Sequence, residues 1–160
     1  MTNATHNPYT APDASLEVTP TSFHYVGFWA RVGAALIDTV LIVAITLPLL
    51  YWIYGRDYFD STGLIQGPLD FLISYIAPAV AIIVFWVYRS ATPGKMAIGA
   101  RIVDARSGTK PSVGQLLGRY LAYYPSSMLL GLGLMWVGWD ARKQGWHDKL
   151  AGTLVVRDKH

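Results

Sequence analysis

The stretch "GFWARVGAALIDTVLIVAITL", residues 27–47, has the length and composition of a helix that enters a membrane. It also carries two charged residues, Arg31 and Asp38, seven positions apart. An Asp or Arg at the centre of a bilayer costs about 2.5–3.5 kcal/mol, whereas each Leu, Ile, Val or Phe contributes only about −0.3 to −0.6 kcal/mol. Two charges inside such a helix therefore indicate a function or a buried partner.

The rest of the chain is also typical of an integral membrane protein. Of its 160 residues, 52% are hydrophobic and only 14% are charged, far from the average of a soluble domain. The apolar residues gather in three runs, at about 26–54, 69–88 and 113–139. Each run is near the roughly 20 residues that cross hydrocarbon, so we expect the lipid bilayer to be the main partner.

Two parts of the chain differ in composition. Residues 1–22 are rich in Thr, Pro, Asn and Ala and lack periodicity, which predicts a disordered tail. They contain no Lys, no Arg and no apolar stretch, so they do not resemble a cleavable leader. Residues 23–158 form the predicted transmembrane domain, whose first span then also serves as the targeting signal.

Little in the sequence favours an enzyme. The absence of cysteine excludes disulfides, thiolate metal sites and cysteine nucleophiles, and the four His residues show no metal-ligand spacing. There is no serine elbow and no glycine-rich phosphate loop, so we expect no enzymatic activity, no metal and no cofactor. The net charge of +3 concerns membrane topology rather than nucleic acid, which we do not expect as a partner.

Adjacent His147 and Asp148 come nearest to a catalytic pair. We interpret them as fixing the last turn before a final strand, with Asp148 accepting from nearby backbone or from an arginine. Two stretches alternate as strands do, "AIGARIVDA" at 97–105 and "AGTLVVRDK" at 151–159. Lone strands are unstable, so we predict that 98–105 pairs with 153–157.

The positions of the basic residues predict topology. The segments before and after the third apolar run carry five Lys or Arg each, whereas the loop between the first two runs has only Arg56. The positive-inside rule therefore puts both basic segments, the two-stranded β element and both termini in the cytoplasm. A run of 27 residues is too short for two spans of about 20, but Pro125, Gly131 and Gly133 can break it.

The predicted fold is accordingly an all-α integral membrane protein with two transmembrane helices and a broken or re-entrant third hydrophobic segment. Three plain spans are the alternative. The small β element lies on the cytoplasmic side in the favoured arrangement.

Helical spacing puts Arg31, Ala34, Ala35 and Asp38 on one face of the first helix. Arg119 lies early in the third run, and the small face made by the two alanines would let it approach. We therefore predict an ion pair between Asp38 and Arg119. Alternatively, Asp38 belongs to another packing ion pair or to an ion or proton site, and Arg31 snorkels at the interface.

Three stretches together resemble the RDD family of small bacterial membrane proteins, which is named for one arginine and two aspartates. "FWARVGAALIDTVLI" at 28–42 supplies Arg31 and Asp38, and "ATPGKMAIGARIVDA" at 91–105 is similar to the segment after the family's second helix. "KQGWHDKLAGTLVV" at 143–156 is similar to the C-terminal signature, in which we match the second aspartate to Asp148, with Asp104 the alternative. The resemblance covers roughly residues 23–158.

The resemblance implies a multi-pass protein of the bacterial cytoplasmic (inner) membrane, with transport of sodium, protons or a small solute as the suggested activity. It transfers no catalytic residue. Two or three spans enclose little of a pathway, so transport requires a homo-oligomer or a larger membrane complex. The alternative is a non-catalytic accessory or assembly subunit that uses its charges to recognise a partner's membrane helix.

Overall fold

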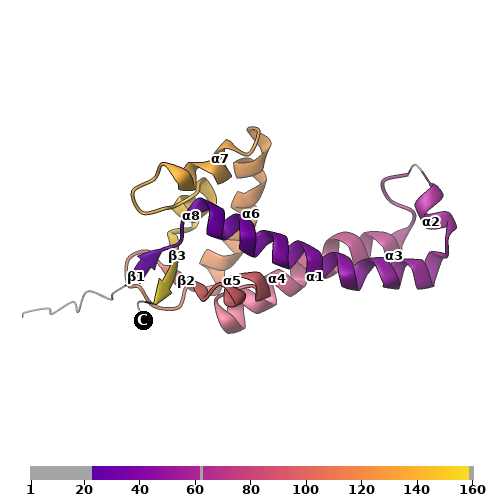
Figure 1. Cartoon of the computed structure of the whole chain (residues 1–160), viewed down its shortest axis with the longest axis horizontal. Helices are drawn as coiled ribbons and strands as arrows, with labels where there is room; N and C mark the ends of the chain where they lie inside the picture. The colour runs from indigo at the N-terminus through magenta and orange to yellow at the C-terminus, as the bar shows by residue number, and fades with distance from the viewer. Residues whose placement is uncertain (1–22, 62, 159–160) are drawn as a thin grey trace, which may run out of the picture.

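A computed structural model describes residues 23–61 and 63–158. Figure 1 shows an elongated molecule with a helical hairpin at one end and a broader head, which contains the sheet, at the other. The predicted disordered tail, 1–22, lies outside the described residues. The hairpin and the head meet where the first long helix begins.

The two arms of the hairpin are the two helices long and apolar enough to cross a membrane. The first is α1, Phe28–Tyr54, and the second runs through α3 (Pro68–Phe71), a π-helical turn (Leu72–Ile76) and α4 (Ala77–Arg89). At 1.5 Å per residue, the 27 residues of α1 extend about 40 Å, more than the roughly 30 Å of a hydrocarbon core. Most apolar side chains of both arms face outward, which suits contact with lipid.

The tip of the hairpin is held by Asp70, which is buried in the first turn of the second arm. Its carboxylate accepts hydrogen bonds from the Tyr58 hydroxyl, the Ser74 hydroxyl and the backbone N–H of Gln66. The carboxylate therefore joins the start of the second arm to the short helix α2, Asp57–Asp60.

The head contains a three-stranded antiparallel sheet in the order β1-β3-β2. The strands β2 (Ala100–Asp104) and β3 (Thr153–Asp158) pair with Ile102 opposite Val155, which confirms the predicted pairing of these segments. The sequence did not indicate the third strand, β1 (Phe23–Tyr25), because three residues are too few for a readable alternation. Ile102 and Val155 lie in the core of the head with Trp86 and Leu116.

The third apolar run is divided. The helix α6, Val113–Met128, begins with a capping box between Ser112 and Gln115. It ends before Leu130 and Gly131, whose φ angles of 51° and 72° leave the helical region. A short helix α7, Leu132–Met135, and a 3₁₀ turn, Trp136–Gly138, follow. Whether this segment enters the bilayer stays a prediction.

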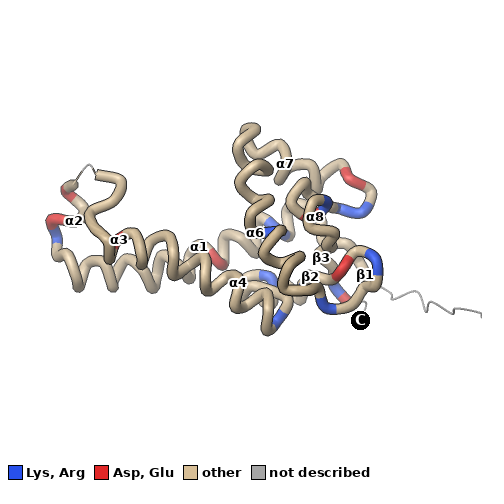
Figure 2. Tube along the Cα trace, turned by 180° about the vertical axis from the view of Figure 1, so that it is seen from behind, with Lys and Arg blue, Asp and Glu red and all other residues tan. Residues whose placement is uncertain are grey.

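Two short helices pack against the longer ones. The helix α5, Pro93–Ala97, packs against α1, and α8, Trp146–Ala151, packs against α6. In Figures 1 and 2, α6 runs across the direction of α1 rather than along it. The beginning of α1 is thus the place where the head and the hairpin contact each other.

Candidate functional site

Asp148 lies at the centre of a charged cluster, in the first turn of α8, with a side chain that is 0% exposed. One oxygen, Oδ1, accepts from Nη1 of Arg119 on α6. The other, Oδ2, accepts from Nη1 of Arg31 on α1 at 2.6 Å and from the N–H of Gly145 at 3.0 Å. The carboxylate therefore joins three helices. The prediction that Asp148 accepts from an arginine is confirmed, and two arginines donate to it.

A local hydrogen bond also orients the side chain of Asp148. Gly145 is the N-cap of α8, and Asp148, three residues later, accepts from its N–H as the acidic residue of a capping box does. A side chain at Gly145 would collide with the ring of His147 and the carbonyl of Gly133. The glycine thus permits the close approach of α7 and α8 that encloses the cluster.

All three guanidinium nitrogens of Arg31 donate hydrogen bonds. Its Nε donates to the carbonyl of Val26 at 3.0 Å, and its Nη2 donates to the carbonyl of Lys143 at 2.5 Å. Its side chain is 12% exposed and bonded to protein groups, so Arg31 does not merely snorkel. Arg31 holds the C-terminal segment against the beginning of α1.

Arg119 is fully buried, and its Nη1 also donates to the Thr153 hydroxyl at 2.7 Å. Burial raises the pKa of the Asp148 carboxyl, but Arg119 and Arg31 outweigh this effect and hold that pKa below its usual range. The carboxylate stays ionised between two cations, which leaves the cluster with one excess positive charge.

His147 contacts the same cluster and stays neutral at physiological pH. Its ring stacks on Tyr123 with centroids 4.1 Å apart, and its Nε2 lies 3.6 Å from Oδ1 of Asp148. Burial and then the charge of Arg119 lower the pKa of His147 to about 3, despite the attraction of Asp148. The imidazole therefore packs beside the ion pairs without adding a charge.

The predicted ion pair between Asp38 and Arg119 is wrong. Asp38 instead accepts from the hydroxyl of Thr92 at 2.5 Å and from the N–H of Gly94 at 2.6 Å, at the start of α5. The small face of α1 is occupied by the backbone of α5, because a Cβ at Gly94 would overlap the Ala34 carbonyl. Helix α5 thus takes the place that the prediction gave to α6.

Sequence reasoning therefore missed Thr92 and Gly94. A signal was present, since Thr followed by Pro marks an N-cap and a first helical residue. Such a helix start offers backbone N–H groups to a carboxylate.

Asp104, the alternative second aspartate, lies away from the arginines, at the end of β2. It accepts from the N–H groups of Ser107 and Arg106 and from the Gln115 amide, and these bonds lower the pKa of its carboxyl. Its bonds hold the turn after β2. Of the two candidates, only Asp148 is brought into contact with Arg31.

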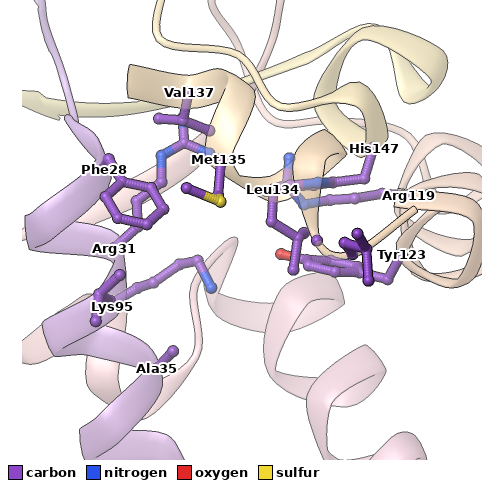
Figure 3. A pocket seen from close by; sticks show the side chains of 13 residues that line it. Phe28, Arg31, Ala35, Lys95, Arg119, Tyr123, Leu134, Met135, Val137 and His147 are labelled. Carbon is purple, nitrogen blue, oxygen red and sulfur yellow. The ribbon is translucent and has the colours of Figure 1, made fainter. Parts of the chain in front are cut away.

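A cavity of about 420 Å³ adjoins the charged cluster, between α1, α5, α6 and α7 (Figure 3). Its charged lining residues are cationic, namely Arg31, Lys95 and Arg119, and most of its other lining is apolar. In the part of the chain that the structure describes, no group of three or more His, Cys, Asp or Glu could hold a metal ion. The arrangement is suited to holding helices together and to attracting an anion.

Most of the Lys and Arg residues lie on the head, as Figure 2 shows, whereas the arms of the hairpin carry almost no charged residues. This distribution is the one that the positive-inside rule associates with the cytoplasmic side.

The chain is similar to a family of proteins and to several individual bacterial proteins. The model of the RDD family matches residues 25–152. The uncharacterized protein RP437 of Rickettsia prowazekii is 25% identical, over 83% of this chain and 96% of its own length. The uncharacterized protein YckC of Bacillus subtilis is 32% identical, over 81% and 83%. The uncharacterized membrane protein YteJ of Bacillus subtilis is 25% identical, over 84% and 82%. No solved structure matches the chain.

Proposed function

The chain belongs to the RDD family, and on that premise we propose that it is a non-catalytic subunit that works in an assembly with other membrane-spanning helices. The observation that carries this proposal is the exposure of the hairpin. In α1 only Ala34 and Leu50 are buried, and in the second arm only Asp70 and Trp86 are. Two helices packed in this way enclose no pathway, so a function inside the membrane needs helices from further chains.

The charges support a structural rather than a catalytic use. Asp38 and Asp148 accept hydrogen bonds on both of their oxygens, and every donor belongs to the protein itself. A general base needs a lone pair directed at a substrate. The two aspartates instead hold α5 and α8 against α1, so that the head presents the hairpin in one orientation.

The proposal places both termini, the sheet and the head in the cytoplasm of a bacterium, with the hairpin in the inner membrane. The exposed apolar face of α6 supports this placement, since Leu117, Leu121, Tyr124 and Met128 recur at helical spacing. Because α6 runs across the direction of α1, this face can lie in the membrane plane. The third hydrophobic segment then returns to the side from which it came.

Cation transport by a homo-oligomer is the second candidate, and one observation favours it. Asp38 and Thr39 line a hollow of about 250 Å³ between the two arms and α6, and Lys95 lines it as well. If a neighbouring copy covered this hollow, a carboxylate and a hydroxyl would lie at the contact between copies, where a cation could exchange with the hydrogen bonds of Asp38.

Site-specific photocrosslinking in native membranes tests the assembly. A photoreactive residue at Val40, which is 65% exposed on α1, should give one or a few discrete crosslinked products. The control position is Leu64, which is 90% exposed at the hairpin tip and should give none of them. Products of twice the chain mass together with sodium or proton flux in proteoliposomes would favour transport. The absence of discrete products at Val40 and at other exposed positions of both arms would overturn the proposal.

A further inference from the structure

We propose that the cavity beside Arg119 binds an anionic phospholipid, with the phosphate group facing Lys95 and an acyl chain against Leu130, Leu134 and Met135. This inference does not depend on the assembly role, because it concerns the head of a single chain. It rests on the charges, the apolar lining and the position of the cavity along α1.

The ammonium group of Lys95 points into the cavity, as Figure 3 shows. Its one hydrogen bond is long, 3.5 Å to the Thr92 hydroxyl, and it lies 5.9 Å from the centre of the Trp86 ring. Within 23–61 and 63–158, no carboxylate forms an ion pair with it. Burial lowers the pKa of this ammonium group, which is the consequence of holding a cation with little compensation.

Arg119 adds two unpartnered N–H donors to the cavity wall. Its side chain is fully buried, yet Nε and Nη2 have no hydrogen-bond partner among the described residues. Asp148 compensates one of the three cations, and Asp38, whose oxygens accept from Thr92 and Gly94, attracts Lys95 without a direct ion pair, so one positive charge remains. The wall therefore carries excess positive charge, which an anion in the cavity would neutralise.

The remaining lining selects an anion with an apolar part. Leu130, Leu134 and Met135 line the cavity from α7 and the residues just before it, and Leu130 is 93% exposed. A volume of about 420 Å³ is within the roughly 300–1,000 Å³ of small-molecule sites. A free phosphate would leave this apolar surface empty, whereas an acyl chain would cover it.

The position of the cavity fits a lipid headgroup. The α1 residues that line it, Phe28, Arg31, Val32 and Ala35, belong to the first turns of that helix. Because α1 exceeds the hydrocarbon thickness by about 10 Å, its first turns can lie at the level of the headgroups while the rest of the helix spans the hydrocarbon. The cytoplasmic leaflet is the anionic one, which agrees with the basic head.

Native mass spectrometry of the full chain, released from mild detergent, tests the charge requirement. Phosphatidylglycerol should be retained about tenfold more strongly than phosphatidylcholine with the same acyl chains. Lys95→Gln should abolish this preference, and Lys95→Arg should keep it. The control, Lys110→Gln, removes the same charge from an exposed loop and should change nothing. Equal retention of the two lipids, or equal effects of Lys95→Gln and Lys110→Gln, would overturn the proposal.

A second pair of variants tests the acyl chain. Leu134→Trp fills the cavity without a change in charge and should lower phosphatidylglycerol retention, whereas Leu121→Trp on the outer face of α6 should not. Thermal unfolding of each variant checks that the fold persists. Soluble glycerol phosphate should compete weakly. If it competes as well as the lipid and Leu134→Trp has no effect, the site takes a free phosphate and the lipid proposal is wrong.

Discussion

Arg31 and Asp148, 117 positions apart in the sequence, form an ion pair of 2.6 Å between Nη1 and Oδ2. The same carboxylate also binds Arg119, so one anion is shared by two guanidinium groups. The first membrane helix therefore starts from a point that the C-terminal segment fixes. Loss of the anion would leave two neighbouring cations without the carboxylate that they share.

Asp148→Asn should destabilise the fold by about 3–5 kcal/mol, because it removes the buried anion and leaves two arginines uncompensated. The measurement is the unfolding free energy in bicelles. The control is Asp158→Asn, which breaks the exposed ion pair with Arg101 and should cost about 0–1 kcal/mol. Equal costs for the two variants would contradict the central role of Asp148.

Double-mutant cycles distinguish the observed ion pair from the one that the sequence predicted. Asp148 and Arg119 share a hydrogen bond, so the effects of Asp148→Asn and Arg119→Gln on the unfolding free energy should couple by about 0.5–3 kcal/mol. Asp38→Asn and Arg119→Gln share no partner and should add to within about 0.5 kcal/mol. Strong coupling in the second cycle would show that Asp38 meets Arg119 after all.

Gly94→Ala should lower stability by about 1–3 kcal/mol, because the new Cβ would overlap the Ala34 carbonyl and lie 2.9 Å from Cγ of Asp38. Gly118→Ala is the matched control, since that position lies in α6 with open space around it. This change should be neutral or stabilise by up to about 1 kcal/mol through helix propensity. A neutral Gly94→Ala would mean that α5 does not pack on α1 so closely.

Stability should fall as pH is lowered from 7.5 to 5. The folded protein holds the pKa of His147 at about 3, below the usual value of 6.5. Between pH 6.5 and pH 3, therefore, His147 binds a proton in the unfolded chain but not in the folded protein. The loss should reach about 2 kcal/mol at pH 5, where the carboxylates are still ionised.

His147→Gln should remove most of this pH dependence, whereas His24→Gln, at an exposed position, should retain it. A slope that survives His147→Gln would assign the pH dependence to another group.

Cysteine labelling tests the topology, and the natural chain contains no cysteine to interfere. Cysteines at Ser107 and Asp158, both in the head, should resist an impermeant thiol reagent added outside intact cells. A cysteine at Leu64, in the hairpin tip, should react. Labelling at Asp158 and Leu64 but not at Ser107 would establish an odd number of crossings.

The membrane helices were predictable from the sequence because they depend on local composition. Apolar runs of about 20 residues give the same helices in any arrangement of the chain. The pairing of β2 with β3 was also predictable, since both alternate over several residues and neither is stable alone. β1 is too short to give such a signal.

The partners of the charges were not predictable in this way. The apolar surroundings of Arg31, Asp38, Arg119 and Asp148 in the sequence already imply that these residues need partners, because a charge at an apolar place is costly wherever the chain folds. Which residues pair depends on the folded arrangement of the helices. Helix α5 packs on the small face of α1, where the Gly94 N–H donates to Asp38. Arg119 pairs with Asp148 instead. Ion pairs act over a few ångströms between segments far apart in the chain, so their choice depends on which backbone can approach most closely.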